Sequence, residues 1–149
     1  MTEVKTQTIS EEKQTTSAGA ELKQTIAYLA ERATNLSNYS AQLRSAVEKI
    51  AVAVSRYNPH MTIVGEIFFT NEKGADYMLH FDDTGLYVKK VEYGLESFVA
   101  LADCSKNAIK AMVPEIPKFL KYAVEQIAIA EQEYKQVSEI AEKMANAIQ

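Results

Sequence analysis

The spacing of apolar residues between residues 22 and 57 constrains this chain more than any other feature. They recur at alternating steps of four and three positions for about five heptads, and no Gly or Pro interrupts them. Such a spacing predicts one apolar seam along a helix of about 40 residues, roughly 60 Å long. One row of this seam holds Leu22, Leu29, Leu36, Leu43 and Ile50, and the other holds Ile26, Ala33, Ser40, Val47 and Val54.

A second seam of the same kind lies at the other end of the chain. It begins after Val113-Pro-Glu-Ile-Pro117, where proline breaks one helix and is tolerated in the first turn of the next. The pattern predicts a helix of about 33 residues, roughly 50 Å long. Its seam consists of Ile116, Leu120, Ala123, Ile127, Ala130, Tyr134, Val137, Ala141, Met144 and Ile148.

The segment between the seams changes period and predicts a β-meander over about residues 60–92. Pro59 ends the first helix, and three runs rich in β-branched and aromatic residues follow, separated by four-residue turns that end at Gly74 and Gly85. We expect strands at 61–70, 75–81 and 86–91, and a short helix from Gly94 or Leu95 to Met112. Alternation predicts one buried face and turns Asp76 and His80 away from it. The buried face would comprise Ile63, Ile67, Phe69, Tyr77, Leu79 and Phe81.

These elements predict an α+β fold that is mostly helical, in the order long helix, three-stranded antiparallel meander, short helix, long helix. The two long helices are expected to form an antiparallel coiled-coil-like hairpin, since the segment between them closes one end. Residues 18–149 then form a single domain. Residues 1–17 are too polar to bury a core and are predicted to be a disordered tail.

The meander and the short helix can cover only one end of the hairpin, which predicts association. Small residues such as Ala30 and Ser37 flank the first seam, so its apolar face is broad and favours a bundle of several helices. Soluble monomers avoid exposing patches of that size. We expect two hairpins to pair as a C2 dimer with a four-helix bundle. The predicted oligomer interface is Leu22, Ile26, Leu29, Leu36, Tyr134, Val137, Ile140, Met144 and Ile148.

Residues with site chemistry are few and widely spaced. His60, His80 and Cys104 lie 20 and 24 positions apart, far from the spacing of a zinc site, and the surroundings of Cys104 do not predict an activated thiol. Asp82 and Asp83 fit a turn better than a calcium loop. Nucleotide-binding and acyl-transfer motifs are missing from the sequence. We therefore predict no catalytic residue, no metal site and no cofactor.

Charge and composition exclude further classes. Twenty acidic against sixteen basic residues argue against binding to nucleic acid. A single cysteine and the lack of a secretory signal favour the cytoplasm, and no apolar run is long enough for a membrane span. Lys89, Lys90, Lys106 and Lys110 lie in a locally basic stretch. A solvated face and a docking patch for an acidic partner both stay open for it.

The sequence predicts a non-enzymatic, homo-oligomeric helical-bundle protein that acts through protein–protein contacts, as an adaptor, scaffold or small chaperone-like protein. Its partners would be itself and another protein, whose identity and pathway the sequence does not indicate. The alternative is a small-molecule-binding module with an aromatic pocket between the meander and the helices. That pocket would be lined by Phe68, Phe69, Tyr77, Phe81, Tyr87 and Phe98. A membrane-active protein that inserts its meander is a weaker alternative, because the strands alternate polar and apolar residues.

Overall fold

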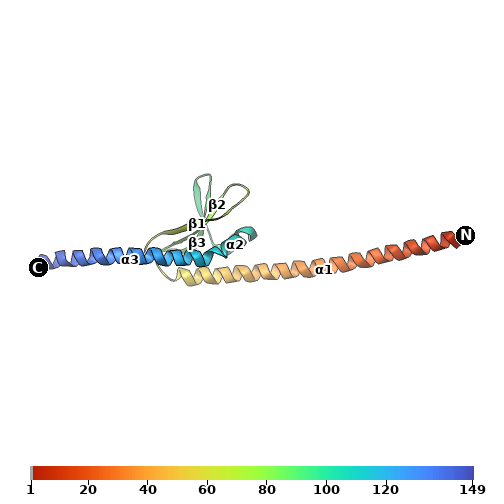
Figure 1. The fold of residues 1–149 in the computed structure, drawn as a ribbon, viewed down its shortest axis with the longest axis horizontal. Coiled ribbons are helices and arrows are strands. Elements are labelled where there is room, and N and C mark those ends of the chain that lie inside the picture. The colour runs from red at the N-terminus through yellow and green to blue at the C-terminus, as the bar shows by residue number, and fades with distance from the viewer. Residues whose placement is uncertain (1) are drawn as a thin grey trace. The chain divides into compact units, whose positions relative to one another are not determined.

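The computed structural model describes the backbone of residues 2–149 and the side chains from residue 16 onward (Figure 1). The chain divides into two compact units, residues 1–42 and residues 43–149, and each is described by itself. The first unit holds only the N-terminal part of helix α1. The complete set of elements is α1 (Thr2–Ser55), β1 (Ile63–Thr70), β2 (Asp76–Asp82), β3 (Gly85–Glu92), β4 (Leu95–Val99), the 3-10 turn η1 (Leu101–Asp103), α2 (Lys106–Met112) and α3 (Glu115–Ala147).

Both long helices are present over the residues of their seams, except that α3 ends at Ala147, one residue before Ile148. Helix α1 ends at Ser55, four residues before Pro59, and α3 begins at Glu115 with Pro117 in its first turn. Helix α1 starts at Thr2 and so includes residues 2–17, which the sequence predicts as a polar tail. The mobility of that segment stays a prediction. Pairing of the two long helices in a hairpin also stays a prediction.

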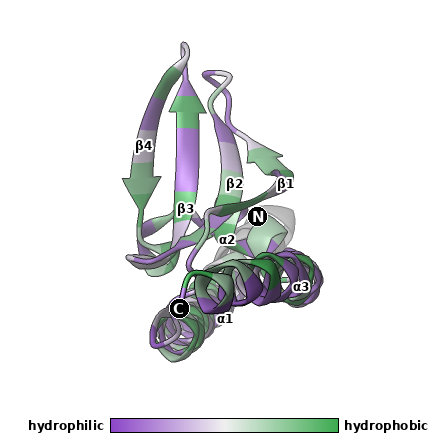
Figure 2. Ribbon diagram, turned by 90° about the vertical axis from the view of Figure 1, so that its left-hand side faces the viewer, coloured by the Kyte–Doolittle hydropathy of each residue, from purple (hydrophilic) through white to green (hydrophobic). Residues whose placement is uncertain are grey.

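The sheet has four antiparallel strands in the order β1-β2-β3-β4 (Figure 2). The first three strands confirm the predicted meander, and Gly74 and Gly85 have the positive φ expected at the ends of their turns. The prediction of only three strands is wrong. Residues 95–99 form β4 along β3, where the sequence predicts the start of a helix.

The extra strand follows from the turn that precedes it. Tyr93 and Gly94 both have positive φ, at 51° and 75°, and join β3 to β4 as the two residues of a tight hairpin loop. Such a loop returns the chain as an antiparallel strand. The predicted helix shortens to α2, whose first turn is capped by Ser105, since the Ser105 Oγ accepts a hydrogen bond from the Ala108 N–H at 3.3 Å.

Strand β1 is irregular, and this corrects one predicted core residue. Its pairing with β2 shifts register between Val64 and Ile67 and again between Ile67 and Phe69. Each such bulge inserts residues that have no partner and resets the alternation of side chains. Ile67 is consequently 55% exposed instead of buried, whereas Ile63 lies in the core as predicted.

The core of the second unit lies between one face of the sheet, α2, and the proximal ends of both seams. Leu43, Val47 and Val54 of α1 pack into it, as do Ile116 and Ala123 of α3, within a cluster that includes Leu79, Val88 and Met112. Two polar links fasten α1 to the rest of this unit. The Arg44 guanidinium donates to the carbonyls of Ala102 and Cys104, and the Ser55 Oγ accepts from the Leu86 N–H at 2.9 Å.

Candidate functional site

The distal parts of the two seams are exposed, each within its own helix. On α1, the side chains of Leu22, Ile26, Leu29 and Leu36 are 54–67% exposed. On α3, Tyr134, Val137, Ile140 and Met144 are 58–75% exposed, and Ile148, the residue directly after the helix, is 87% exposed. All nine residues of the predicted interface therefore lie on the surface of the described chain, and all except Ile148 lie on the helix that the sequence predicts. Their role as an interface is untested.

The residues that flank the two distal seams carry opposite charge. In heptad terms, Lys23 and Arg32 lie beside the seam of α1, and Glu131 and Glu133 lie beside the seam of α3. Other flanking positions are small on both helices, among them Ala30 and Ser37 on α1 and Ala145 and Ala147 on α3. Each helix face is thus an apolar stripe with a few charges of one sign at its border.

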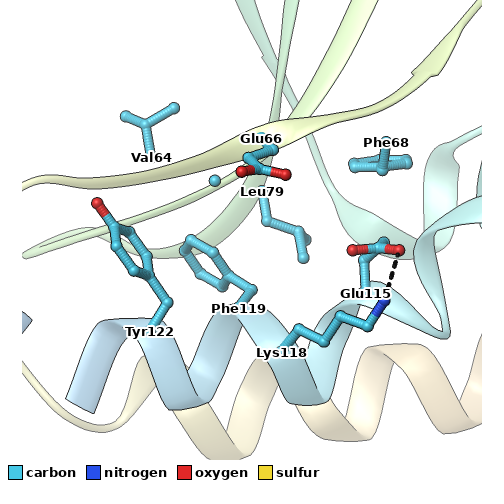
Figure 3. A pocket seen from close by; sticks show the side chains of 9 residues that line it. Val64, Glu66, Phe68, Leu79, Glu115, Lys118, Phe119 and Tyr122 are labelled. Atoms are coloured by element: carbon cyan, nitrogen blue, oxygen red, sulfur yellow. Dashed lines mark ion pairs between the residues drawn. The ribbon is translucent and has the colours of Figure 1, made fainter. Parts of the chain in front are cut away.

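A groove of about 370 Å³ lies between β1 and the first turns of α3 (Figure 3). Its floor is buried and apolar, since Phe119 is 5% exposed and Leu79 is 2% exposed. Its rim is polar and aromatic. The lining residues are Val64, Gly65, Glu66, Phe68, Leu79, Glu115, Lys118, Phe119 and Tyr122.

The aromatic pocket predicted between the meander and the helices is mostly wrong in its residues. Of the six predicted side chains only Phe68 lines the groove. Tyr77 and Phe81 belong to the buried core, and Phe69 packs on Tyr77 with ring centroids 5.4 Å apart. Tyr87 donates its hydroxyl proton to the Thr84 carbonyl. Phe98 packs edge-on against His80 with centroids 4.8 Å apart.

Sequence reasoning missed Glu66, Phe119 and Tyr122 as site residues, although one signal was available. Ile67, Phe68 and Phe69 are three adjacent apolar residues, which cannot all face one side of a regular strand. A bulge beside the run is one arrangement that accounts for it, and a strand covered on both faces is another. The partners from α3 had no comparable signal, because tertiary packing alone brings them to β1.

His80 is buried on the sheet face opposite Leu79, and it is linked to the turn that follows β2. Its Nε2 lies 2.9 Å from the Asp82 Oδ2, while its Nδ1 is buried and has no hydrogen-bond partner among the residues whose side chains are described. The Thr84 hydroxyl and N–H both donate to the Asp82 Oδ1. The Thr84 hydroxyl and the hydrogen bond from His80 lower the pKa of Asp82 from 3.8 to about 2. These contacts make the imidazole part of a turn-stabilising network, as the turn interpretation of Asp82 predicts.

Cys104 and His60 lie in different surroundings from His80. Cys104 directly follows η1 and is 3% exposed, and burial together with the nearby Asp103 charge raises the pKa of its thiol from 9.0 to about 11. A thiol in this state is a poor nucleophile. His60 is exposed in the loop between α1 and β1, and its backbone N–H donates a hydrogen bond to the Asn58 Oδ1. Within the described residues no group of three or more His, Cys, Asp or Glu side chains is arranged to hold a metal ion.

The basic stretch does not form one free patch. Lys89 pairs with Glu96 at 2.8 Å across β3 and β4, and Lys90 pairs with Glu92 at 3.6 Å while lying over the Tyr77 ring. Lys106 and Lys110 are exposed on α2. Half of the four lysines are therefore engaged locally, which leaves the docking role untested.

Comparison with protein families, with curated proteins and with solved structures finds no match to this chain. No helix within the described residues combines the length and the hydropathy that crossing a bilayer requires.

Proposed function

We propose that this chain is a non-enzymatic, homo-oligomeric helical-bundle protein that acts through protein–protein contacts, and that its first partner is a second copy of itself. The observation that carries the proposal is the exposure of both distal seams. Leu22, Leu29 and Leu36 lie in one row on α1 and are 60–67% exposed. Contiguous apolar surface of this kind is characteristic of interaction sites in soluble proteins.

The seams favour helical partners over irregular ones. An apolar repeat of 3.5 residues is the geometry in which each side chain inserts between four residues of a facing helix. On each helix the repeat runs on from the part that packs into the core, through Leu43 on α1 and Ala123 on α3. The distal parts therefore present the same kind of apolar surface that packs into the core at the proximal ends of the two helices.

The flanking charges favour pairing of α1 with α3. Lys23 and Arg32 on α1 complement Glu131 and Glu133 on α3, and opposite charges beside a seam select partner and orientation. An antiparallel register that places Leu22 against Met144 also places Arg32 next to Glu133. We propose this contact between α1 of one copy and α3 of another, within an antiparallel four-helix bundle.

Measurement of the solution mass tests the association. We expect size-exclusion chromatography with light scattering at micromolar concentration to give twice the 16.6 kDa chain mass. Leu29→Asp removes about 1.5–3 kcal/mol of burial per copy, so the dissociation constant rises about a hundredfold or more. Glu31→Asp, on the outward face of the same helix, is the matched control. A monomeric wild type would refute the proposal.

A charge exchange tests the pairing itself. Arg32→Glu and Glu133→Arg should each weaken the dimer, and the double variant should regain its affinity because the pair is restored with reversed sign. Glu142→Arg, on the outward face of α3, should leave affinity unchanged. If the loss of dimerisation free energy in the double variant equals the sum of the losses in the two single variants, the two seams do not face each other.

A further inference from the structure

The groove between β1 and α3 is built by the irregular residues of β1. Gly65, Glu66 and Phe68 are the β1 residues without a register partner on β2, and all three line the groove. Bulges redirect side chains and are common next to binding sites. Here Gly65, Glu66 and Phe68 all line the groove, whereas a regular strand would place Gly65 on the opposite face from Glu66 and Phe68.

Gly65 allows the groove to have a floor. A Cβ at this position would lie 2.9 Å from the Phe119 Cδ2, so only glycine lets the ring pack against the strand backbone. Phe119 and Leu79 belong to the hydrophobic core and form the apolar base of the groove. The space above that base is open to solvent.

The charges around the groove favour a cation. Glu115 pairs with Lys118 at 3.5 Å, whereas Glu66 has no ion pair or hydrogen bond with any part of the chain that the structure describes. The lining therefore carries one uncompensated negative charge. Figure 3 places the Glu66 carboxylate between Tyr122 at one end and Phe68 at the other.

Three aromatic rings also favour a cation in the groove. Phe68, Phe119 and Tyr122 line the groove together with Glu66, and the negative face of an aromatic ring attracts an ammonium group. An anion would meet a single lysine that is already paired. We propose that this groove binds a small organic cation with an apolar body, such as an alkylated or aromatic amine. The residues lie outside both seams, so the proposal is independent of the oligomer.

Three probes of similar size and different charge test this inference. Benzyltrimethylammonium, benzyl alcohol and phenylacetate are titrated into the ¹⁵N-labelled full chain, and amide shifts are followed. We expect saturable shifts confined to residues 64–68 and 115–122 for the cation, weaker binding of the alcohol and no binding of the anion. Equal affinity for the three probes, or no saturable shift with the cation, would overturn the proposal.

A pair of exposed glutamates provides the variant and its control. Glu66→Gln keeps the size of the side chain and should weaken benzyltrimethylammonium about fivefold through loss of the charge. Glu72→Gln, in the turn after β1, should leave the affinity unchanged because it lies outside the groove. If Glu66→Gln binds as tightly as the wild type, the carboxylate does not recognise the cation.

Discussion

Substitution of Gly65 by alanine should destabilise the second unit through one close contact. The added Cβ would lie 2.9 Å from the Phe119 Cδ2 and 3.3 Å from its Cε2. The ring is 5% exposed and cannot move aside without disturbing the core. Overpacking of this kind costs about 1–3 kcal/mol. The alanine regains up to about 1 kcal/mol because it restricts the unfolded chain. We expect a net loss of about 1–2 kcal/mol.

The single cysteine provides the assay. Cys104 is 3% exposed in the same unit as Gly65, so its alkylation in native buffer requires the core to open. When reclosing is faster than alkylation, the labelling rate follows the population of the open state. A loss of about 1.4 kcal/mol then raises the rate about tenfold. Mass spectrometry of quenched samples measures this rate at one fixed protein concentration.

Two controls show whether the contact is the cause. Gly19→Ala lies in the first unit, where the added Cβ meets nothing within 4 Å among the described residues apart from the neighbouring backbone of its own helix, and it should leave the labelling rate unchanged. In a Phe119→Leu background the smaller side chain relieves the clash, so Gly65→Ala should cost less there than in the wild type. An unchanged rate in Gly65→Ala, or an equal cost in both backgrounds, would refute the steric reasoning.

Three further variants test other contacts of the second unit. Arg44→Met removes two hydrogen bonds to carbonyls between β4 and α2, and should cost about 1.5–3 kcal/mol in urea denaturation; a cost near zero would show that the bonds add nothing. Asp82 has a pKa lowered to about 2, first by Thr84, so its contribution to stability is complete above its unfolded value of 3.8 and is lost as pH falls toward 2. Asp82→Asn should therefore lose less stability than the wild type in acid titration, and equal losses would contradict the assignment. Tyr93→Asn should raise the unfolding free energy by about 0.5–1 kcal/mol, since asparagine tolerates the positive φ at the tip next to Gly94 better than tyrosine; a lower melting temperature would contradict this.

The strands show how far local patterns reach. The sequence predicts β1, β2 and β3 because their turns end in Gly74 and Gly85, residues suited to positive φ. It misses β4 because Leu95, Phe98, Leu101 and Ala102 are spaced like a helix face. The deciding feature is the turn at Tyr93, and tyrosine is not a residue that predicts positive φ.

The groove was beyond local patterns for a different reason. Its position between meander and helices follows from the order of the elements, but its lining depends on two bulges in β1 and on the placement of α3. A bulge changes which face every later residue of the strand occupies. The sequence did not predict the bulge between Val64 and Ile67. For that reason Ile67 was expected in the core and not on the surface, and Glu66 was not expected to line the groove.

The seams show the limit of prediction from periodicity most clearly. Leu29 and Val47 both belong to the apolar seam of α1, yet Leu29 is 67% exposed and Val47 is 1% exposed. The repeat is a local property that makes a helix face apolar, whereas burial requires another element to lie on that face. Within the second unit α3 shows the same contrast between Ala123, which is buried, and Val137, which is exposed. Both helices keep the repeat past the point where burial ends, so the distal surface is apolar and exposed. In the proposed dimer the two seams of the second copy cover this surface. The oligomeric state in solution is therefore the first property to measure.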